Sequence, residues 1–210
     1  MEDIKNGKEI IIITAPAIKI AFDGYWRHVL QWFRNNGTKE IYDVSLGADI
    51  CTWAHIKYLE KNKGKKIISQ PCAAIVNYIV QHKPKALNYL SPVHSPMLCL
   101  AIYVKKYLGK RCKIAALSPC IAKKNEFDET GYIDYNVTFK HLKDYFEKNN
   151  VDLPNIKVYS EFEFNLAQGF LGAIYPKPGG LKENLLLHVP KLHVINSEGV
   201  EKVYKEFDDY

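Results

Sequence analysis

Two cysteines each follow a proline at the end of an apolar run. Cys72 ends the segment SQPC, directly after the run KIIS, and Cys120 ends the segment SPC, directly after the run CKIAAL. If both runs are parallel strands, both thiols lie outside strand carboxyl ends, where open α/β sheets bind ligands. Each thiol also precedes an expected helix, whose N-terminal amides stabilise a thiolate. The placement favours two metal or cluster ligands; the alternative is two buried structural thiols.

Charged residues follow Cys120 at helical spacing. In PCIAKKNE, Lys123 and Glu126 are three and six residues after Cys120, so all three share a broad face of the expected helix. An ammonium group beside a thiolate can donate hydrogen bonds to an anionic ligand. The alternative is an ordinary surface Lys–Glu pair, which contributes little to stability.

The other residues that could ligate a metal or bind a ligand are expected to have structural roles. Three further thiols stand where core or near-surface groups are expected: Cys51, Cys99 and Cys112. Of the histidines, His94 is expected to be a hydrogen-bonded loop residue, and His188 and His193 lack zinc-ligand spacing. A zinc site formed by the two Pro-Cys thiols and two histidines is a further alternative. The glycines of Pro178-Gly179-Gly180 lack P-loop spacing and favour a structural turn.

Apolar runs alternate with helical periodicity along the chain. Strands are expected at 9–14, 40–44, 66–69, 112–117, 157–159 and 192–195, and helices at 22–36, 49–61, 73–81, 95–108, 138–148, 161–171 and 199–207. This alternation predicts an α/β fold with mainly parallel sheets flanked by helices. Short loops predict two closely packed lobes, with the active site between them at strand carboxyl ends.

The composition is that of an ordinary globular chain. Its 210 residues carry a formal net charge of +6, but the lysines are scattered, which favours a solvated face over a nucleic-acid partner. The polar, acidic start gives no secretory signal, and no apolar run is long enough to span a membrane. We therefore expect a cytoplasmic chain whose five cysteines are reduced or ligate metal.

Several segments together resemble the iron-only (FeFe) hydrogenases. SPCIAKKNE resembles the family's second signature, usually Met-Pro-Cys-x-x-Lys-x-x-Glu, and SQPCAAIVNYI resembles the first, usually Thr-Ser-Cys-Cys-Pro. TAPAIKIAF resembles the strand-end loop that borders the active-site iron pair. YLSPVHSPM and IYPKPGGLKENL resemble the segment between the two signatures and the loop before the third. The matches run in family order and cover nearly all of the chain.

The resemblance implies a cofactor called the H-cluster. This is a cubane 4Fe–4S cluster on four cysteines, one of which bridges to a two-iron centre with CO and CN ligands. Cys72 and Cys120 match cubane ligands of the first and second signatures.

Four other residues acquire expected roles from the same resemblance. Lys123 matches the lysine that hydrogen-bonds a cyanide, and Glu126 matches the carboxylate that pairs nearby; both are the expected catalytic residues. Ala15 and Pro16 match the loop that lines the two-iron centre. A buried anionic cofactor needs such cationic and backbone donors around it.

The chain departs from the family pattern at three points. Pro71 stands where the family has a second cysteine, and His55 and Tyr58 stand where it has two proton-carrying glutamates. The last signature, with its two cysteines, is not found. The first two departures resemble the divergent branch to which a sensory role is ascribed. Residues 1–210 are thus expected to be a partial H-cluster domain, without the upstream ferredoxin-like domain or the last signature.

The resemblance implies that the complete protein interconverts H2 with protons and electrons, as an enzyme or a hydrogen sensor. Its implied partners are a ferredoxin-type electron carrier or fused iron–sulfur domain and the hydrogenase maturation machinery. The H-cluster is expected to be absent or incomplete in this chain, which would be inactive alone. The alternative is a cluster-less sensing or scaffold domain without catalysis.

Overall fold

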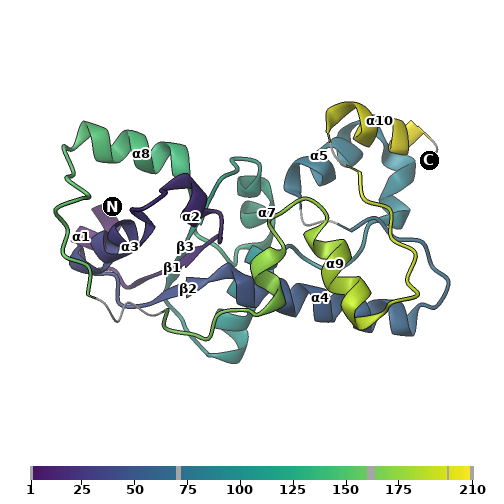
Figure 1. Ribbon diagram of the computed structural model, residues 1–210, viewed down its shortest axis with the longest axis horizontal. Coiled ribbons are helices and arrows are strands. Elements are labelled where there is room, and N and C mark those ends of the chain that lie inside the picture. The colour runs from purple at the N-terminus through teal and green to yellow at the C-terminus, as the bar shows by residue number, and fades with distance from the viewer. Residues whose placement is uncertain (1, 70–71, 160–163, 198, 209–210) are drawn as a thin grey trace.

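The computed structural model describes residues 2–69, 72–159, 164–197 and 199–208 (Figure 1). The strands are β1 (Ile10–Thr14), β2 (Ile41–Asp43), β3 (Lys113–Ser118) and β4 (Tyr135–Thr138). The helices are α1 (Glu2–Lys5), α2 (Ile18–Ala21), α3 (Trp26–Asn35), α4 (Val44–Lys61), α5 (Ala73–His82), α6 (Pro96–Ile102), α7 (Lys123–Thr130), α8 (Phe139–Lys148), α9 (Gly180–His188) and α10 (Val200–Asp208). Three shorter turns are the 3-10 segments η1 (Pro84–Tyr89) and η3 (Leu171–Ile174) and the π-helical segment η2 (Tyr103–Tyr107).

The four strands form one parallel sheet in the order β2-β1-β3-β4. Thr14, at the end of β1, pairs with Asp43 of β2 and Leu117 of β3, so the strands end level with one another. The predicted α/β class with parallel pairing is confirmed. All four carboxyl ends therefore meet at one edge, where the loops that carry Ala15, Pro16 and Cys120 begin.

Both faces of the sheet are covered, which explains the uninterrupted apolar run in β1. Side chains alternate between faces along a strand. Ile10 and Ile12 pack with α3 and α8, whereas Ile11 and Ile13 pack with α6 and α7. A strand buried on both sides has no solvent-facing position to fill with a polar residue.

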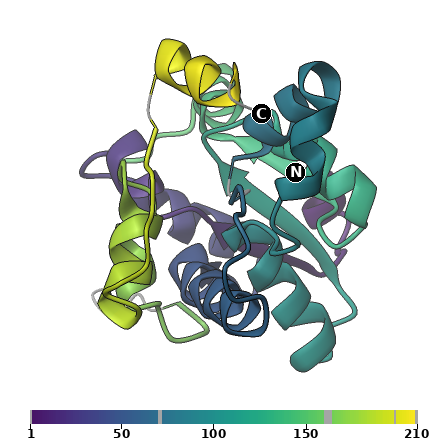
Figure 2. The ribbon, with the colours of Figure 1, turned by 90° about the vertical axis from the view of Figure 1, so that its right-hand side faces the viewer.

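The other half of the molecule is built from helices around α4. This helix contacts α6, η3 and α9. The last helix, α10, packs on α5 and η1 through Phe207, Ile79 and Ala86, and Figure 2 shows α10 and α5 together at one end of the molecule. None of the described helices combines the length and apolar character needed to cross a membrane.

Three expected strands do not form as strands of a sheet. Segment 66–69 is reduced to a single parallel bridge between Ile68 and Leu90, and 157–159 and 192–195 are irregular. In segment 66–69, Ile68 N donates to the carbonyl oxygen of Tyr89 and Ile68 O accepts from Ser91 N, so this backbone pairs with the loop after η1 instead of the sheet. The sequence does not predict β4, because its four residues lead directly into the threonine cap of α8.

Two expected helices also differ from the prediction. The helix expected at 95–108 is α6 followed by the π-helical η2. Of the helix expected at 161–171, residues 161–163 lie outside the described residues, and 164–170 are not helical. Ser45 Oγ accepts a hydrogen bond from Gly169 N at 2.9 Å, and Asp49 Oδ2 accepts one from Phe170 N at 2.8 Å. Side chains of α4 thus satisfy backbone donors that a helix would otherwise use.

Candidate functional site

The carboxyl edge of the sheet brings together the loop after β1 and the loop after β3. Ala15 N donates to the carbonyl oxygen of Leu117 at 2.9 Å, which extends the pairing of the two strands by one residue. Ala15 and Pro16 therefore lie beside the segment that leads through Ser118 to Cys120. Three of the six residues singled out from the sequence share this edge.

The backbone around Cys120 is fixed by two polar side chains. Asn136 Nδ2, from β4, donates to the carbonyl oxygens of Cys120 at 3.1 Å and Ile121 at 3.2 Å. Ser118 Oγ, buried at the end of β3, accepts from Cys120 N at 3.3 Å. These contacts hold the half-buried thiol just before α7. Sequence reasoning missed both partners, because Asn136 lies on the unrecognised strand β4.

Lys123 and Glu126 form a partly buried ion pair rather than a surface one. Lys123 Nζ lies 3.0 Å from Glu126 Oε2, and their side chains are 14% and 16% exposed. Glu126 also accepts from Ser95, from its N at 3.2 Å and from its Oγ at 2.8 Å. Ser95 caps α6 and is fully buried, so the carboxylate joins the first turn of α7 to the start of α6. The only sequence signal for Ser95 is a serine before a proline, a common helix start.

Cys72 occupies the N-cap position of α5, as expected from the sequence. The prediction that it follows a strand of the sheet is wrong, because segment 66–69 pairs only with Leu90. The carbonyl oxygen of Cys72 accepts hydrogen bonds from the backbone N of Ile75 at 3.1 Å and of Val76 at 3.2 Å. Its thiol is exposed. The helix that it starts contacts α7, the helix that follows Cys120. Pro71, the departure from the family's Cys-Cys pair, lies outside the described residues.

The described donors match only part of an H-cluster site. Cubane clusters are held by four cysteine thiolates, and the two Pro-Cys thiols supply half of that number. Among the residues that the structure describes, no group of three or more His, Cys, Asp or Glu side chains could hold a metal ion. The residues present therefore do not complete a site for the cofactor, nor for the zinc alternative.

The remaining candidates from the sequence have structural surroundings. His55 is buried on α4, with its Nδ1 2.9 Å from the carbonyl oxygen of Cys51, and Tyr58 Oη accepts from Lys65 Nζ at 2.9 Å. Gly179 has a φ of 75° and begins α9, and a Cβ on Gly180 would lie 2.3 Å from the carbonyl oxygen of Ile174. The expected glycine turn is confirmed, with a steric reason for both glycines.

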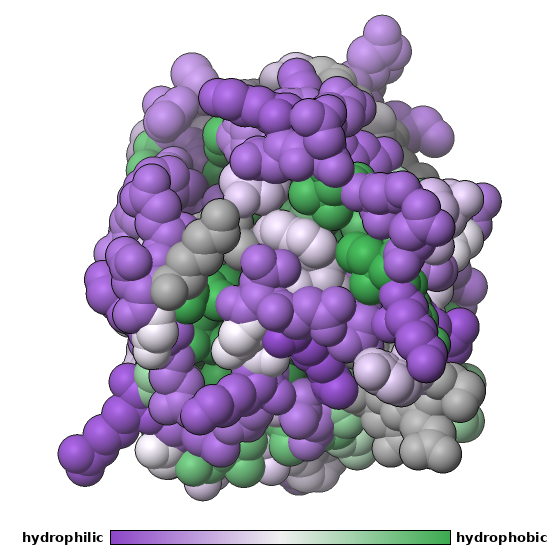
Figure 3. Space-filling view, turned by 90° about the vertical axis from the view of Figure 1, so that its left-hand side faces the viewer, coloured by the Kyte–Doolittle hydropathy of each residue, from purple (hydrophilic) through white to green (hydrophobic). Residues whose placement is uncertain are grey.

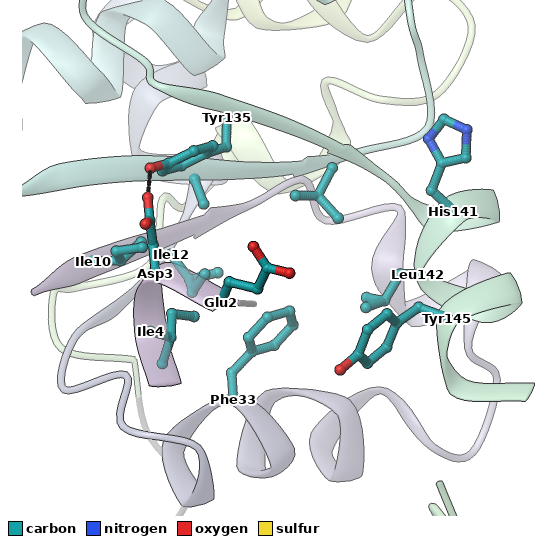
Figure 4. Close-up of a pocket in the computed structure, with 12 residues that line it drawn as sticks. Glu2, Asp3, Ile4, Ile10, Ile12, Phe33, Tyr135, His141, Leu142 and Tyr145 are labelled. Carbon is teal, nitrogen blue, oxygen red and sulfur yellow. Dashed lines mark hydrogen bonds between the residues drawn. The ribbon is translucent and has the colours of Figure 1, made fainter. Parts of the chain in front are cut away.

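A cavity outside the candidate site lies against the part of the sheet that α1, α3 and α8 cover. It measures about 530 Å3. Apolar side chains show between polar ones on this face of the molecule (Figure 3). In Figure 4 the Phe33 and Glu2 side chains point into the cavity, and Tyr135 donates to Asp3 at its rim. Hydrogen bonds from Lys8 and Tyr135 lower the pKa of Asp3 to about 2. None of the six candidate residues lines this cavity.

Comparison with known proteins decides the family. Residues 8–207 match the family model described as the iron only hydrogenase large subunit, C-terminal domain. This chain belongs to that family. The match covers the whole sheet, both Pro-Cys thiols and the helical half.

Solved FeFe-hydrogenases share the fold of this family member. A structure concerned with oxygen inactivation and degradation of the H-cluster 2Fe subcluster aligns with a TM-score of 0.67 at 19% identity, over 92% of this chain and 56% of that one. The apo FeFe-hydrogenase HydA1 of Chlamydomonas reinhardtii aligns with a TM-score of 0.66 at 19% identity, over 91% of this chain and 57% of that one. At these identities the likeness is one of fold.

A curated sequence relative is described as a probable cytosolic Fe-S cluster assembly factor of Drosophila ananassae. It is 25% identical over 128 residues, which cover 55% of this chain and 27% of the relative. This hydrogenase-family chain thus spans about a quarter of the curated relative and about half of the hydrogenase chains.

Proposed function

We propose that this chain is part of an H-cluster domain in which Cys72 and Cys120 are two of the four cubane ligands. The observation that carries the proposal is the shared sheet edge. The loop after β1, with Ala15, adjoins the segment leading to Cys120, and a partly buried Lys–Glu pair follows on α7. A cluster with anionic ligands requires this combination of thiolates, backbone amides and a cationic donor.

In this proposal each of the remaining candidate residues acts on the cofactor from the protein side. With the cofactor bound, Lys123 would donate to a cyanide of the two-iron centre, and Glu126 would hold the lysine in position. Ala15 and Pro16 would line the two-iron centre. The other cubane ligands and the electron path are supplied outside the described residues, the latter by a ferredoxin-type carrier or fused iron–sulfur domain. Maturation enzymes of the hydrogenase type load the cofactor in the cytoplasm.

The complete protein then interconverts H2 with protons and electrons, slowly enough to serve as a hydrogen sensor. The family's second thiol and its two glutamates are replaced by Pro71, His55 and Tyr58. Of these, His55 is buried at 1% exposure and hydrogen-bonded to its own helix. Because histidine stands here in place of a family glutamate, the carboxylate that would carry protons is missing.

The test measures iron content and hydrogen turnover of the complete polypeptide that carries this domain, after anaerobic maturation. We expect bound iron, a visible charge-transfer band and slow turnover. A protein that stays free of iron after maturation would refute the proposal.

A second candidate function is an iron–sulfur assembly or scaffold role without hydrogen chemistry. It is favoured by the curated relative, whose name describes cluster assembly. Iron without hydrogen turnover, together with transfer of that iron to an apo acceptor protein, would favour this candidate over the hydrogenase proposal.

A further inference from the structure

Two buried thiols outside the candidate site lie next to one another. Cys51 belongs to α4 and is 0% exposed, and Cys99 belongs to α6 and is 9% exposed. Neither is part of a disulfide. Both sulfur atoms lie within hydrogen-bond distance of one acceptor, the carbonyl oxygen of His94, Cys51 Sγ at 3.3 Å and Cys99 Sγ at 3.4 Å. The two sulfur atoms therefore lie side by side across a helix–helix contact.

A glycine explains why two helices come close enough for such short side chains to meet. A Cβ on Gly47 of α4 would lie 2.1 Å from the carbonyl oxygen of Pro96, the first residue of α6. Cys51 stands one helical turn after Gly47, and Cys99 one turn after Pro96. Gly47 lies against Leu100 and Cys51 lies against His94, so the two helices run antiparallel. Close approach at the glycine thus brings Cys51 against the first turn of α6, which carries Cys99.

The surroundings make the two thiols chemically unequal. Cys51 Sγ lies 3.2 Å from Tyr175 Oη and 3.7 Å from His55 Nδ1, and no such partner contacts Cys99 Sγ within the described residues. Hydrogen bonding from Cys99, and then from His55 and Tyr175, lowers the pKa of Cys51 to about 5 despite its burial. The bond to Cys51 and burial both raise the pKa of Cys99. Such a pair combines a thiolate nucleophile with a neighbouring protonated thiol.

We propose that Cys51 and Cys99 form a redox-active dithiol that a small hydroperoxide oxidises to a disulfide linking α4 to α6. The sulfur of Cys51 attacks a peroxide oxygen, the O–O bond breaks, and a sulfenic acid and one water form. The sulfur of Cys99 then attacks the sulfenic sulfur, the S–O bond breaks, and a second water leaves with the thiol proton. Two thiols lose two electrons in total, and one hydrogen peroxide becomes two waters.

Burial sets the specificity of this dithiol. Since Cys51 is fully covered and Cys99 nearly so, an oxidant must be small enough to enter through local opening. Hydrogen peroxide meets that requirement, whereas glutathione disulfide, which must seat a whole tripeptide on the attacked sulfur, does not. Exposed Cys72 has no such restriction.

Oxidation of Cys51 and Cys99 would also affect the candidate site, through the backbone that joins His94 to Ser95. A disulfide has no S–H group, so neither sulfur could then donate to the carbonyl oxygen of His94. The next residue, Ser95, donates its N–H and hydroxyl to Glu126, which holds Lys123. This last consequence rests on the proposed function, whereas the disulfide itself does not.

The test uses the full 210-residue chain without iron, treated with hydrogen peroxide, alkylated in denaturant and digested. We expect a peptide that joins Cys51 to Cys99, with the mass of two hydrogen atoms lost, and its disappearance after dithiothreitol. Glutathione disulfide at the same concentration should leave this pair reduced while it modifies Cys72.

A background with serine at the other three cysteine positions separates this pair from the rest. In that background peroxide should consume both remaining thiols together, and adding Cys51→Ser or Cys99→Ser should prevent the cross-link. Circular dichroism of each variant establishes that it is folded. Two thiols that survive peroxide in the folded background, or a Cys51 sulfinic acid without a cross-link, would overturn the proposal.

Discussion

Glu126 links two residues on different elements, Ser95 at the start of α6 and Lys123 on α7. It accepts from Ser95 N and Oγ and forms the ion pair with Lys123, and all of these atoms are mostly shielded from water. A buried hydrogen-bonded charge is costly to disrupt from one side, because its partners are left without an acceptor. Whatever ligand Lys123 contacts, its position depends on this carboxylate.

Replacing the carboxylate should therefore destabilise the fold. We expect Glu126→Ala to lower the free energy of unfolding by about 2–3 kcal/mol, since the buried N–H and hydroxyl of Ser95 lose their acceptor. Urea denaturation measures the change. Asp128→Ala is the matched control, because the Lys124–Asp128 pair on the same helix is about 60% exposed and should contribute less than about 1 kcal/mol. Equal losses in the two variants would contradict this role of Glu126.

The thiol pair gives a pH dependence of stability. The pKa of Cys51 is lowered from 9.0 to about 5 in the fold, so its contribution is fully present above pH 9 and is lost as the pH falls through 5. We expect the stability of the wild type relative to Cys51→Ser to decrease over this window, as measured by urea midpoints. The stability of Cys112→Ser should change with pH as that of the wild type does in this window, because burial raises the pKa of the Cys112 thiol. A constant difference between wild type and Cys51→Ser would show that no thiolate forms.

At the scale of elements, the sequence predicts best what is decided locally. The runs that become β1 and β3 are apolar because both faces of the sheet are covered, and this signal needs no knowledge of partners. The threonine cap of α8 is equally local. The segment before η3 is different, since Ser45 and Asp49, more than 120 residues away, bind its backbone amides. Helical periodicity at 161–171 could not reveal that competition.

In the candidate site, too, the sequence predicts what is decided locally and misses what depends on distant residues. Cys72 and Cys120 were accessible to sequence reasoning because each stands next to a proline and before an expected helix. Sequence reasoning could not find three further residues: Ser118 and Asn136, which fix Cys120, and Ser95, which holds Glu126. Their roles depend on the tertiary structure, namely on the register of the strands and on the approach of α6 to α7.

The close contact between α4 and α6 makes a prediction about Gly47. In an exposed helix Gly→Ala stabilises by about 1 kcal/mol. Here the added Cβ would lie 2.1 Å from Pro96 O and 2.8 Å from Leu100 Cβ, so the helices must separate. We expect Gly47→Ala to destabilise the chain by about 2–3 kcal/mol in urea denaturation. A stabilised variant would mean that this helix contact is looser than described.

At the scale of the whole molecule, a parallel sheet and a helical half meet where the candidate residues lie. β2 leads directly into α4, and β3 leads through Cys120 into α7, so the strand ends face the helical half (Figure 1). The family match and the shared fold of the solved hydrogenases agree with this architecture. The described donors nevertheless amount to two thiolates of the four that hold a cubane cluster.

An incomplete ligand set should leave the isolated chain without catalysis. We expect residues 1–210, matured anaerobically, to show no hydrogen evolution from a reduced viologen, because two thiolates do not hold a cubane cluster tightly. A known FeFe-hydrogenase matured in parallel is the positive control. Sustained hydrogen evolution by the 210-residue chain would refute the expectation.

The most direct test of the central claim is the iron content of cysteine variants of the complete polypeptide after anaerobic maturation. Cys72→Ser and Cys120→Ser should each lose most of the cluster iron and its visible absorption. Cys112→Ser, at the start of β3 and away from the carboxyl edge, should keep the iron content of the wild type. Full iron content in both Cys72→Ser and Cys120→Ser would contradict their assignment as ligands.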